Sequence, residues 1–398
     1  MPHAAGARQG ITLILLSTLP ILAIAGLVAD LPLLLQVFHQ VSGHELLVPM
    51  VLTLPSLCVA LFSSVAGVVA DRWGRRPLLL CALAAFSVLG LAPLLFSTLP
   101  ALLTSRLFVG LAEASILTCT NALWGDYFGE DERRRWLGLQ QMSGPVSNAL
   151  LALAGGVLAA HHWASPFWLY LLGLPALLLA FAFLHEPHRP AGAGQTTGPG
   201  AARIPMKYPW CLAGRIAAVT LGVSIVFFAL AIQQGRVFEA LGVHSPARSG
   251  QLIMLVSLAA MLGAVCFNVL RARPVAYLLC LGLACYGLSY LGIWLAGSVA
   301  TGAMASALGQ FGSSIVLPTL IAWTLTSFPA EHRGRGIGLW GAVFFAGQFL
   351  SAPLLTGLEH LSGSLRAGFG IIGTVTLLAV ITTAWSGRAA QPNGAAQH

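Results

Sequence analysis

The feature that most constrains this chain is a series of apolar runs, each about as long as a bilayer is thick, separated by short polar segments. Hydrophobic residues make up 57% of the 398 positions and charged residues only 8%, whereas a typical soluble domain has about 25% charged residues. The mean hydropathy is +0.84. Because a soluble domain cannot bury so much apolar surface, we expect an all-α membrane protein with many spans.

Twelve segments have the ~20 residues that a membrane-spanning helix needs. The first is too long for a signal peptide and is expected to be retained. A segment rich in Gly, Pro, Ala and Thr, 186–209, indicates a cytoplasmic linker between two bundles, 1–185 and 210–398, the second ending in a short tail. The predicted spans are 11–36, 47–70, 77–97, 99–123, 136–160 and 166–185, then 211–233, 249–271, 274–296, 299–325, 336–358 and 366–386.

The basic residues favour alternate segments between these spans. Of the twenty Lys and Arg residues, sixteen lie in one set of alternate segments and the termini, and Arg106 lies inside the fourth span. The opposite set holds three, Arg236, Arg248 and Arg366. Cytoplasmic loops carry an excess of Lys and Arg. The pattern predicts two cytoplasmic termini, and the +8 net charge is a sign of topology rather than of nucleic-acid binding.

The segment between the second and third spans reads Gly67-Val-Val-Ala-Asp71-Arg72-Trp-Gly74-Arg75-Arg76-Pro77. Such a charged turn cannot lie in hydrocarbon and must mark a membrane face. We expect Gly67 to allow a close helix approach and Gly74 to allow the chain to reverse. The spacing Gly-x-x-x-Asp-Arg-x-Gly-Arg-Arg resembles the loop between helices two and three of the major facilitator superfamily.

That resemblance implies two pseudo-symmetric six-helix bundles and transport by alternating access. It also implies a cytoplasmic charge cluster of Asp71, Arg75 and Asp126 that latches the two bundles together in the outward-open state. Gly67, Arg72 and Gly74 complete the predicted latch, and the start of the eleventh helix would offer Asp71 its positive dipole. The alternative is a basic anchor that only sets topology.

The two bundles repeat a motif at a constant offset of 200. Phe128, Arg133, Arg135 and Gly138 between the fourth and fifth spans match Phe328, Arg333, Arg335 and Gly338 between the tenth and eleventh. This repeat supports duplication of a six-helix unit, with a binding site between the halves near the middle of the membrane. The counterpart of the Asp71 loop, Leu270–Pro274, keeps the basic turn but lacks the acid.

Three ionisable side chains are expected deep in the membrane: Asp30, Arg106 and Glu113. A charge at the bilayer centre costs ~2.5–3.5 kcal/mol, so residues of this kind are functional candidates. Arg106 begins Arg-Leu-Phe-Val-Gly110, which resembles the helix-four signature of the superfamily. We expect Asp30 to pair with Arg106 when ionised and to release it when protonated, with Glu113 as a further proton site. The alternative is a static ion pair between the first and fourth helices.

Polar and aromatic side chains inside the spans are candidates for a substrate cavity. Aromatic rings at Phe108, Phe227 and Phe345 would add an apolar wall for a lipophilic molecule. Each residue is also a candidate for ordinary helix packing. The predicted cavity residues are Asn148, Gln233, Gln310, Trp340, Phe344 and Gln348.

Drug antiporters of this superfamily carry a Gly-Pro-x-x-Gly-Gly signature in helix five, which is out of register here. Gly144-Pro145 is followed by Val-Ser-Asn, and Gly155-Gly156 comes two to three turns later. This departure weakens the antiporter assignment, although small residues and a proline kink remain.

The predicted function is a secondary transporter of a bacterial inner membrane that exports a small lipophilic or drug-like molecule in exchange for protons. The alternatives are a proton-coupled exporter of a specific metabolite, such as a sugar or siderophore, an importer, and a non-transporting receptor. No phosphate loop, nucleophile elbow or metal-binding pair occurs, so we expect no enzyme activity and no cofactor or metal. The expected partners are the substrate, protons and membrane lipid, without nucleic acid, and the expected state is a monomer.

Overall fold

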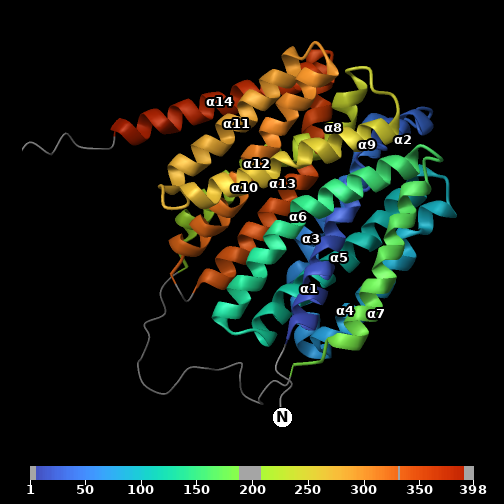
Figure 1. Ribbon diagram of the computed structural model, residues 1–398, viewed down its shortest axis with the longest axis vertical. Coiled ribbons are helices and arrows are strands. Elements are labelled where there is room, and N and C mark those ends of the chain that lie inside the picture. Colours follow the sequence, from blue (N-terminus) through green and yellow to red (C-terminus); the bar gives the residue numbers. More distant parts are fainter. Residues whose placement is uncertain (1–5, 188–207, 330–331, 390–398) are drawn as a thin grey trace, which may run out of the picture.

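The computed structural model describes residues 6–187, 208–329 and 332–389. Within these ranges twelve helices are long and apolar enough to cross a bilayer, and no strand is present. The predicted all-α fold with twelve spans is therefore confirmed (Figure 1). Most of the predicted linker 186–209 and the end of the tail lie outside the described residues.

The first half is built from the blue to green helices of Figure 1. Its fifth and first spans pack against each other, as do its second and fourth. The helices are α1 (Ala7–Ala25), α2 (Leu31–Val37), α3 (His44–Trp73), α4 (Arg75–Gly90), η1 (Ala92–Leu94), α5 (Leu99–Tyr127), α6 (Glu130–Ala159), η2 (Ser165–Leu172) and α7 (Gly173–Phe183).

The second half is built from the yellow to red helices. Its eleventh span packs on the seventh, and its ninth packs on the tenth and twelfth. The helices are α8 (Trp210–Glu239), α9 (Pro246–Ser257), α10 (Ala259–Leu270), α11 (Val275–Leu295), α12 (Val299–Ser327), α13 (Arg333–Ser362) and α14 (Leu365–Ala389).

The first predicted span is interrupted where Asp30 lies. Helix α1 ends at Ala25, a turn covers Gly26–Asp30, and α2 begins at Leu31 with Pro32 in its first turn. A proline is tolerated there because the first N–H groups of a helix have no partner within the helix. Asp30 therefore occupies the capping position of α2 rather than the middle of a continuous helix.

The repeat at offset 200 has a structural counterpart. Phe128 and Phe328 follow the last residues of α5 and α12, and both are buried. Trp136 lies 5.8 Å from the Phe128 ring, centre to centre. Its counterpart 200 residues on, Gly336, lies against the Phe328 ring so closely that any added side chain would collide with it. The same helix corner is thus filled by an indole in one half and by close backbone approach in the other.

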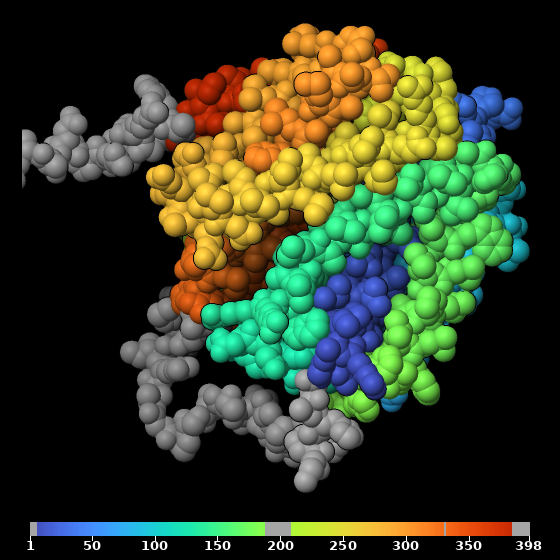
Figure 2. Space-filling model, viewed as in Figure 1, coloured from blue at the N-terminus to red at the C-terminus, as the bar shows by residue number. Residues whose placement is uncertain are grey.

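The two halves meet at one end of the bundle, which we call the closed end. It holds the start of α3 and α9 and the end of α8 and α13. The opposite end, which holds the basic segments 72–76, 133–135 and 333–335, we call the basic end. Gly156 of α6 lies against Gly250 of α9 so tightly that an added Cβ would be 2.9 Å from the Gly250 Cα atom. Gly235 of α8 lies against the Val28 carbonyl. Between α6 and α12–α13, away from this end, Figure 2 shows a hollow.

Candidate functional site

Asp30 is completely buried, and neither oxygen of its carboxyl group has a hydrogen-bond partner among the described residues. Its position is set by the interrupted first span, because its backbone carbonyl accepts the first hydrogen bond of α2 from Leu34. Two residues earlier, Val28 touches Gly235 of the other half. A buried carboxylate without partners is costly, whereas the neutral acid is tolerated at much lower cost.

Arg106 is also completely buried, but its guanidinium is satisfied within the first half. It donates to the Tyr170 hydroxyl at 2.7 Å and to the Gly90 carbonyl at 3.2 Å. It also lies over two aromatic rings, 5.0 Å from the Phe167 centre and 4.8 Å from the Tyr170 centre.

The predicted ion pair between Asp30 and Arg106 is therefore wrong for this conformation. The Tyr170 ring can reach Arg106 because Gly90 has no side chain, and a Cβ there would overlap the ring. The one residue in the sequence that could have indicated this arrangement is Gly90, and a hydropathy pattern does not distinguish such a glycine from others. The roles of Asp30 and Arg106 in proton coupling stay predictions.

Glu113 lies seven residues after Arg106 on α5 and is 4% exposed. One of its carboxylate oxygens is buried without a hydrogen-bond partner among the described residues. Its neighbour Gly110 packs directly on the backbone of Pro55 in α3. Glu113 is therefore a second buried acid in the first half, at the contact between the second and fourth spans.

The turn between α3 and α4 has the predicted backbone reversal. Gly74 has φ of 98° and ψ of 151°, a conformation that only glycine adopts readily. Arg75 and Asp126, two members of the predicted charge cluster, form an ion pair at the end of α5, and Arg75 also donates to the Ala122 carbonyl at 3.1 Å. Gly67 differs from the prediction, because an added Cβ would meet only the Thr118 methyl group, at an ordinary 3.8 Å.

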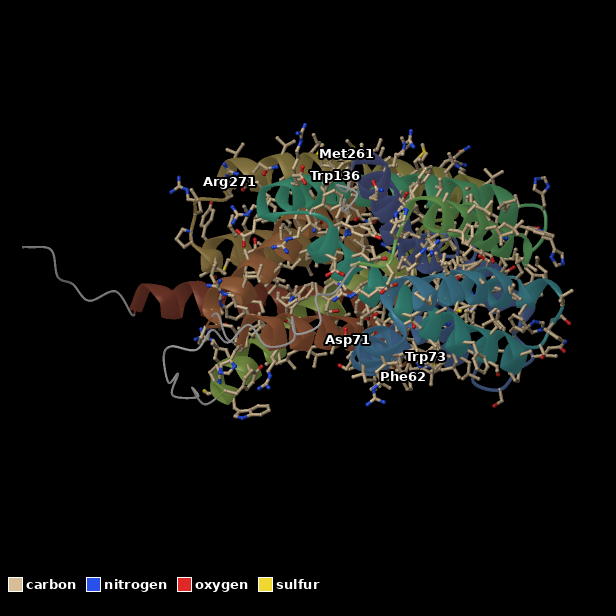
Figure 3. The ribbon with its side chains drawn as sticks, turned by 90° about the horizontal axis from the view of Figure 1, so that it is seen from below. Phe62, Asp71, Trp73, Trp136, Met261 and Arg271 are labelled. Carbon is tan, nitrogen blue, oxygen red and sulfur yellow. The ribbon has the colours of Figure 1, made fainter. Side chains whose placement is uncertain are left out.

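Asp71 is exposed at the boundary of the two halves. In Figure 3, which looks from below, it lies between the blue helices of the first half and the red-brown helices of the second, whereas Trp73 and Phe62 lie on the outer surface. Trp73 is 76% exposed. Asp71 and the exposed Arg72 are thus placed where a latch between the halves would act, and that role stays a prediction.

Glu186 is a partner of this turn that sequence reasoning missed. Its two carboxylate oxygens accept from the backbone N–H groups of Arg75 and Arg76 at 2.8 and 2.7 Å. Glu186, three residues after the end of α7, thereby caps the start of α4, where an anion also interacts favourably with the helix dipole. The Arg76 side chain reaches back to the Phe181 carbonyl at 2.9 Å. In the sequence, Glu186 is an isolated acid after the sixth span, and nothing there indicates that it meets the basic turn.

The predicted polar cavity residues take different places. Asn148 of α6 donates to the Ser257 hydroxyl of α9 at 3.0 Å and so joins the two halves. Gln310 of α12 lies 3.5 Å from the Gln234 side chain of α8. Gln233 is completely buried, with both amide atoms lacking partners among the described residues, and Gln348 is 5% exposed.

The predicted aromatic residues gather in the second half. The rings of Trp340 and Phe344 stack at 5.2 Å with an angle of 15° between their planes. Phe228 and Phe227 lie 5.2 and 6.0 Å from Phe344. Phe108, expected in the same wall, is instead 50% exposed on α5 and belongs to no described ring pair.

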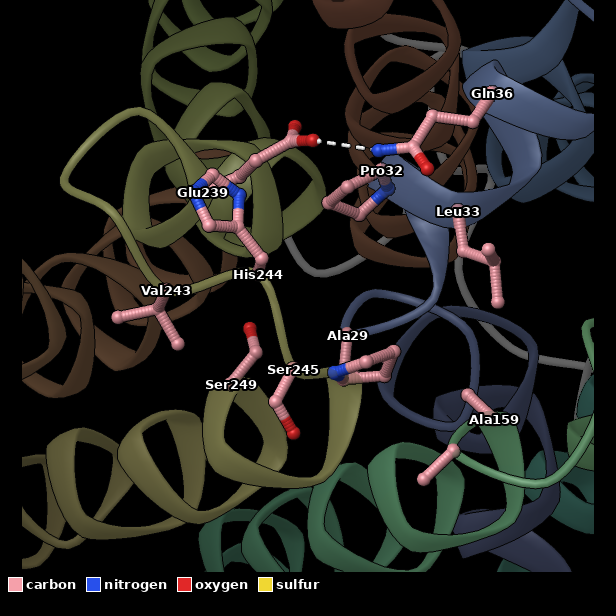
Figure 4. A pocket seen from close by; sticks show the side chains of 12 residues that line it. Ala29, Pro32, Leu33, Gln36, Ala159, Glu239, Val243, His244, Ser245 and Ser249 are labelled. Carbon is pink, nitrogen blue, oxygen red and sulfur yellow. Dashed lines mark hydrogen bonds between the residues drawn. The ribbon is translucent and has the colours of Figure 1, made fainter.

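A cavity of about 220 Å³ lies between the halves at the closed end. Figure 4 shows Glu239 on one side and Pro32 and Leu33 on the other, with Gln36 donating to the Glu239 carboxylate at 3.1 Å. This bond is one of the contacts that close the end. No group of three or more His, Cys, Asp or Glu residues in the described ranges could hold a metal ion.

Comparison with protein families gives a match over residues 13–275, to the Major Facilitator Superfamily. A curated relative, the 3-(3-hydroxy-phenyl)propionate transporter of Escherichia coli, is 28% identical over 338 residues, 78% of this chain and 76% of the relative. The tetracycline resistance protein of class G from Vibrio anguillarum is 32% identical over 166 residues, so the chain matches only 38% of that protein.

Solved structures share the fold at low sequence identity. A D-xylose-proton symporter superposes with a TM-score of 0.73 at 15% identity, covering 94% of this chain and 96% of the symporter. The human organic anion transporter superposes with a TM-score of 0.69 at 17% identity, over 96% of this chain and 100% of that one. These likenesses concern the arrangement of the helices.

Proposed function

Because this chain belongs to the major facilitator superfamily and is a transporter rather than an enzyme, we propose that it exports a small lipophilic molecule in exchange for protons. The observation that carries the proposal is Asp30, a completely buried acid without partners among the described residues, at the break in the first span. A group that is costly to bury as an anion makes the packing around it depend on protonation.

Proton binding at Asp30 would favour the closed end in its observed form. The turn that carries Asp30 packs backbone to backbone on α8 through Val28 and Gly235. Neutralising the carboxyl group removes the cost of enclosing a charge there, so the closed end is stabilised and the hollow at the basic end is exposed. The ionised form would favour separation of the same surfaces, which water could then reach.

The charge pattern of the chain orients this cycle. With the basic end in the cytoplasm, the closed end faces outward, the structure is open to the cytoplasm, and the termini are cytoplasmic. In this orientation the opposite, outward-open state would be held by the latch residues and their partner, Asp71, Arg75, Asp126 and Glu186. Asp71 would be the residue that reaches the second half. The protein would act as a monomer in a bacterial inner membrane.

Two relatives favour different cargoes. The tetracycline resistance protein supports export of a lipophilic drug. The second candidate is transport of one aromatic acid, because the 3-(3-hydroxy-phenyl)propionate transporter matches 78% of the chain. The stacked rings of Trp340 and Phe344 would suit a planar aromatic group in either cargo. A sugar or siderophore would need more polar groups than this wall offers.

Flux in inside-out membrane vesicles tests the proposal. We expect tetracycline or a similar lipophilic compound to accumulate when respiration generates a proton gradient, and the uptake to collapse when a protonophore is added. Asp30→Asn should abolish the response to the gradient, whereas the exposed control Glu132→Gln should keep it. Wild-type proton-driven uptake by Asp30→Asn would remove Asp30 from the mechanism.

The second candidate has a distinct outcome in the same system. Accumulation of 3-(3-hydroxyphenyl)propionate in right-side-out vesicles, with no uptake of lipophilic drugs by inside-out vesicles, would replace export by import. Absence of flux for every compound tested would contradict both candidates.

A further inference from the structure

The closed end carries a layer of ionisable side chains that the proton site at Asp30 does not use. Glu45 lies in the first turn of α3 in the first half, and Glu359 and His360 lie near the end of α13 in the second half. The layer borders a water-accessible cavity of about 380 Å³. These groups are therefore in contact with the solution at this end of the protein.

Within this layer, Glu359 forms an ion pair with a residue of its own half. Arg236 of α8 donates to both of its carboxylate oxygens, at 2.8 and 3.0 Å. Such a two-pronged pair fixes Glu359 and neutralises its charge. The adjacent His360 is left to face the other half.

His360 contacts Glu45 across the boundary between the halves. Its Nε2 atom lies 2.9 Å from a carboxylate oxygen of Glu45. One turn earlier on α13, the Thr356 hydroxyl donates to the Glu45 backbone carbonyl at 3.5 Å, so the two helices are in register at this point. The His360 and Glu45 side chains are 64% and 55% exposed, so both are accessible to the surrounding solution.

We propose that His360 and Glu45 form a pH-responsive lock that stabilises the closed end when the solution bathing it is acidic. Imidazole groups change charge between about pH 5 and 8. A protonated His360 attracts the Glu45 carboxylate, whereas a neutral ring offers it only a hydrogen bond. Since this attraction exists only when the two halves meet, closure and protonation of His360 favour each other.

The surrounding charges do not compete for His360. On α8, Arg236 is held by Glu359, and Glu239 accepts from Gln36. On α14, Arg366 donates to backbone carbonyls at the end of α11, including Trp294 at 2.8 Å. On α3, His44 lies against the Val41 carbonyl, 3.1 Å from its Nδ1 atom. Glu45 is thus the acid from the opposite half that faces His360.

The lock rests on the proposed alternating access but is separate from Asp30. In a proton-driven exporter, acid on the outer side would both load Asp30 and strengthen the lock, so the two act in the same direction. An exposed ion pair is weak, and we expect protonation of His360 to change the ratio of closed to open molecules by about two- to fivefold.

The lock is testable by electron paramagnetic resonance distance measurements on the purified full chain. Spin labels replace Gln40 in the first half and the 73% exposed Leu295 in the second, in a cysteine-free background. As the pH falls from 8 to 5.5, we expect the short-distance population to grow. His360→Gln should make the ratio of closed to open molecules at pH 5.5 about two- to fivefold smaller than in the wild type. His360→Arg, which is always charged, should give a larger short-distance population than the wild type at pH 8.

Two further variants separate the lock from the proton site and from histidines in general. In Asp30→Asn the part of the pH response that depends on His360 should persist, whereas loss of all transport in that variant would concern only the proposed function. His244→Gln, an exposed histidine at the same end, should respond like the wild type. An unchanged pH response in His360→Gln, or a wild type without any response, would overturn the lock.

Discussion

Glu186 shows at the scale of one residue how this fold completes a motif with a side chain from elsewhere in the sequence. The Gly74 turn exposes the first N–H groups of α4, and a helix start needs acceptors for these groups. Glu186, more than a hundred residues later, supplies both of its oxygens to them. The turn, the ion pair of Arg75 with Asp126 and the end of α7 therefore form one unit within the first half.

Removing the charge of Glu186 tests this unit. We expect Glu186→Gln to lower the stability of the first half by about 1 kcal/mol, because one of two charge-assisted acceptors is lost at a helix start. The loss is measured as a lower midpoint of thermal unfolding in detergent. Glu132→Gln, on an exposed position of α6, serves as the control. An unchanged midpoint in Glu186→Gln would mean that solvent replaces its bonds at no cost.

The sequence predicts the charged residues better than their partners. Asp30, Arg106 and Glu113 are all buried, as their apolar surroundings suggested. The partner of Arg106 depends on Gly90, which leaves room for the Tyr170 ring and brings the hydroxyl to the guanidinium. Such a choice follows from how three helices pack, and helical periodicity cannot reveal it.

At the scale of helices, close contacts within the first half and between the halves depend on glycine. Gly155 and Gly156 at the end of α6 face in two directions, the first onto the Gly26 carbonyl of the first span and the second onto Gly250 of α9. The pair stands out of register with the signature of drug antiporters, yet it brings the fifth span against both the first and the eighth. The function of the pair follows from its neighbours rather than from its distance to Pro145.

A single methyl group at this contact should shift the conformational equilibrium. In Gly156→Ala the new Cβ would lie 2.5 Å from the Pro246 carbonyl oxygen and 2.9 Å from the Gly250 Cα atom, so the halves must separate. We expect a longer distance between spin labels at Gln40 and Leu295, and slower transport. Gly144→Ala, on the same helix with open space around it, should change neither. A short distance in Gly156→Ala would show that the contact adapts without opening.

At the scale of the whole molecule, the twelve spans and the duplicated halves follow from hydropathy and from the repeat at offset 200. The helix ends at Phe128 and Phe328 match because the same corner is built twice. The arrangement of the two halves is a different matter, since one sequence must support at least two arrangements in alternating access. A sequence pattern predicts the parts that both arrangements share, and the closed end seen here belongs to one of them.

The most direct test is to measure both ends of the bundle in the same protein as Asp30 is titrated. One pair of labels, at Gln40 and Leu295, reports on the closed end, and a second, at Gln141 and the 77% exposed Val269, reports on the basic end. With His360→Gln removing the lock, the account predicts that acid shortens the first distance and lengthens the second, and that Asp30→Asn abolishes both changes. Distances that vary independently of each other, or a reciprocal change that persists in Asp30→Asn, would contradict it.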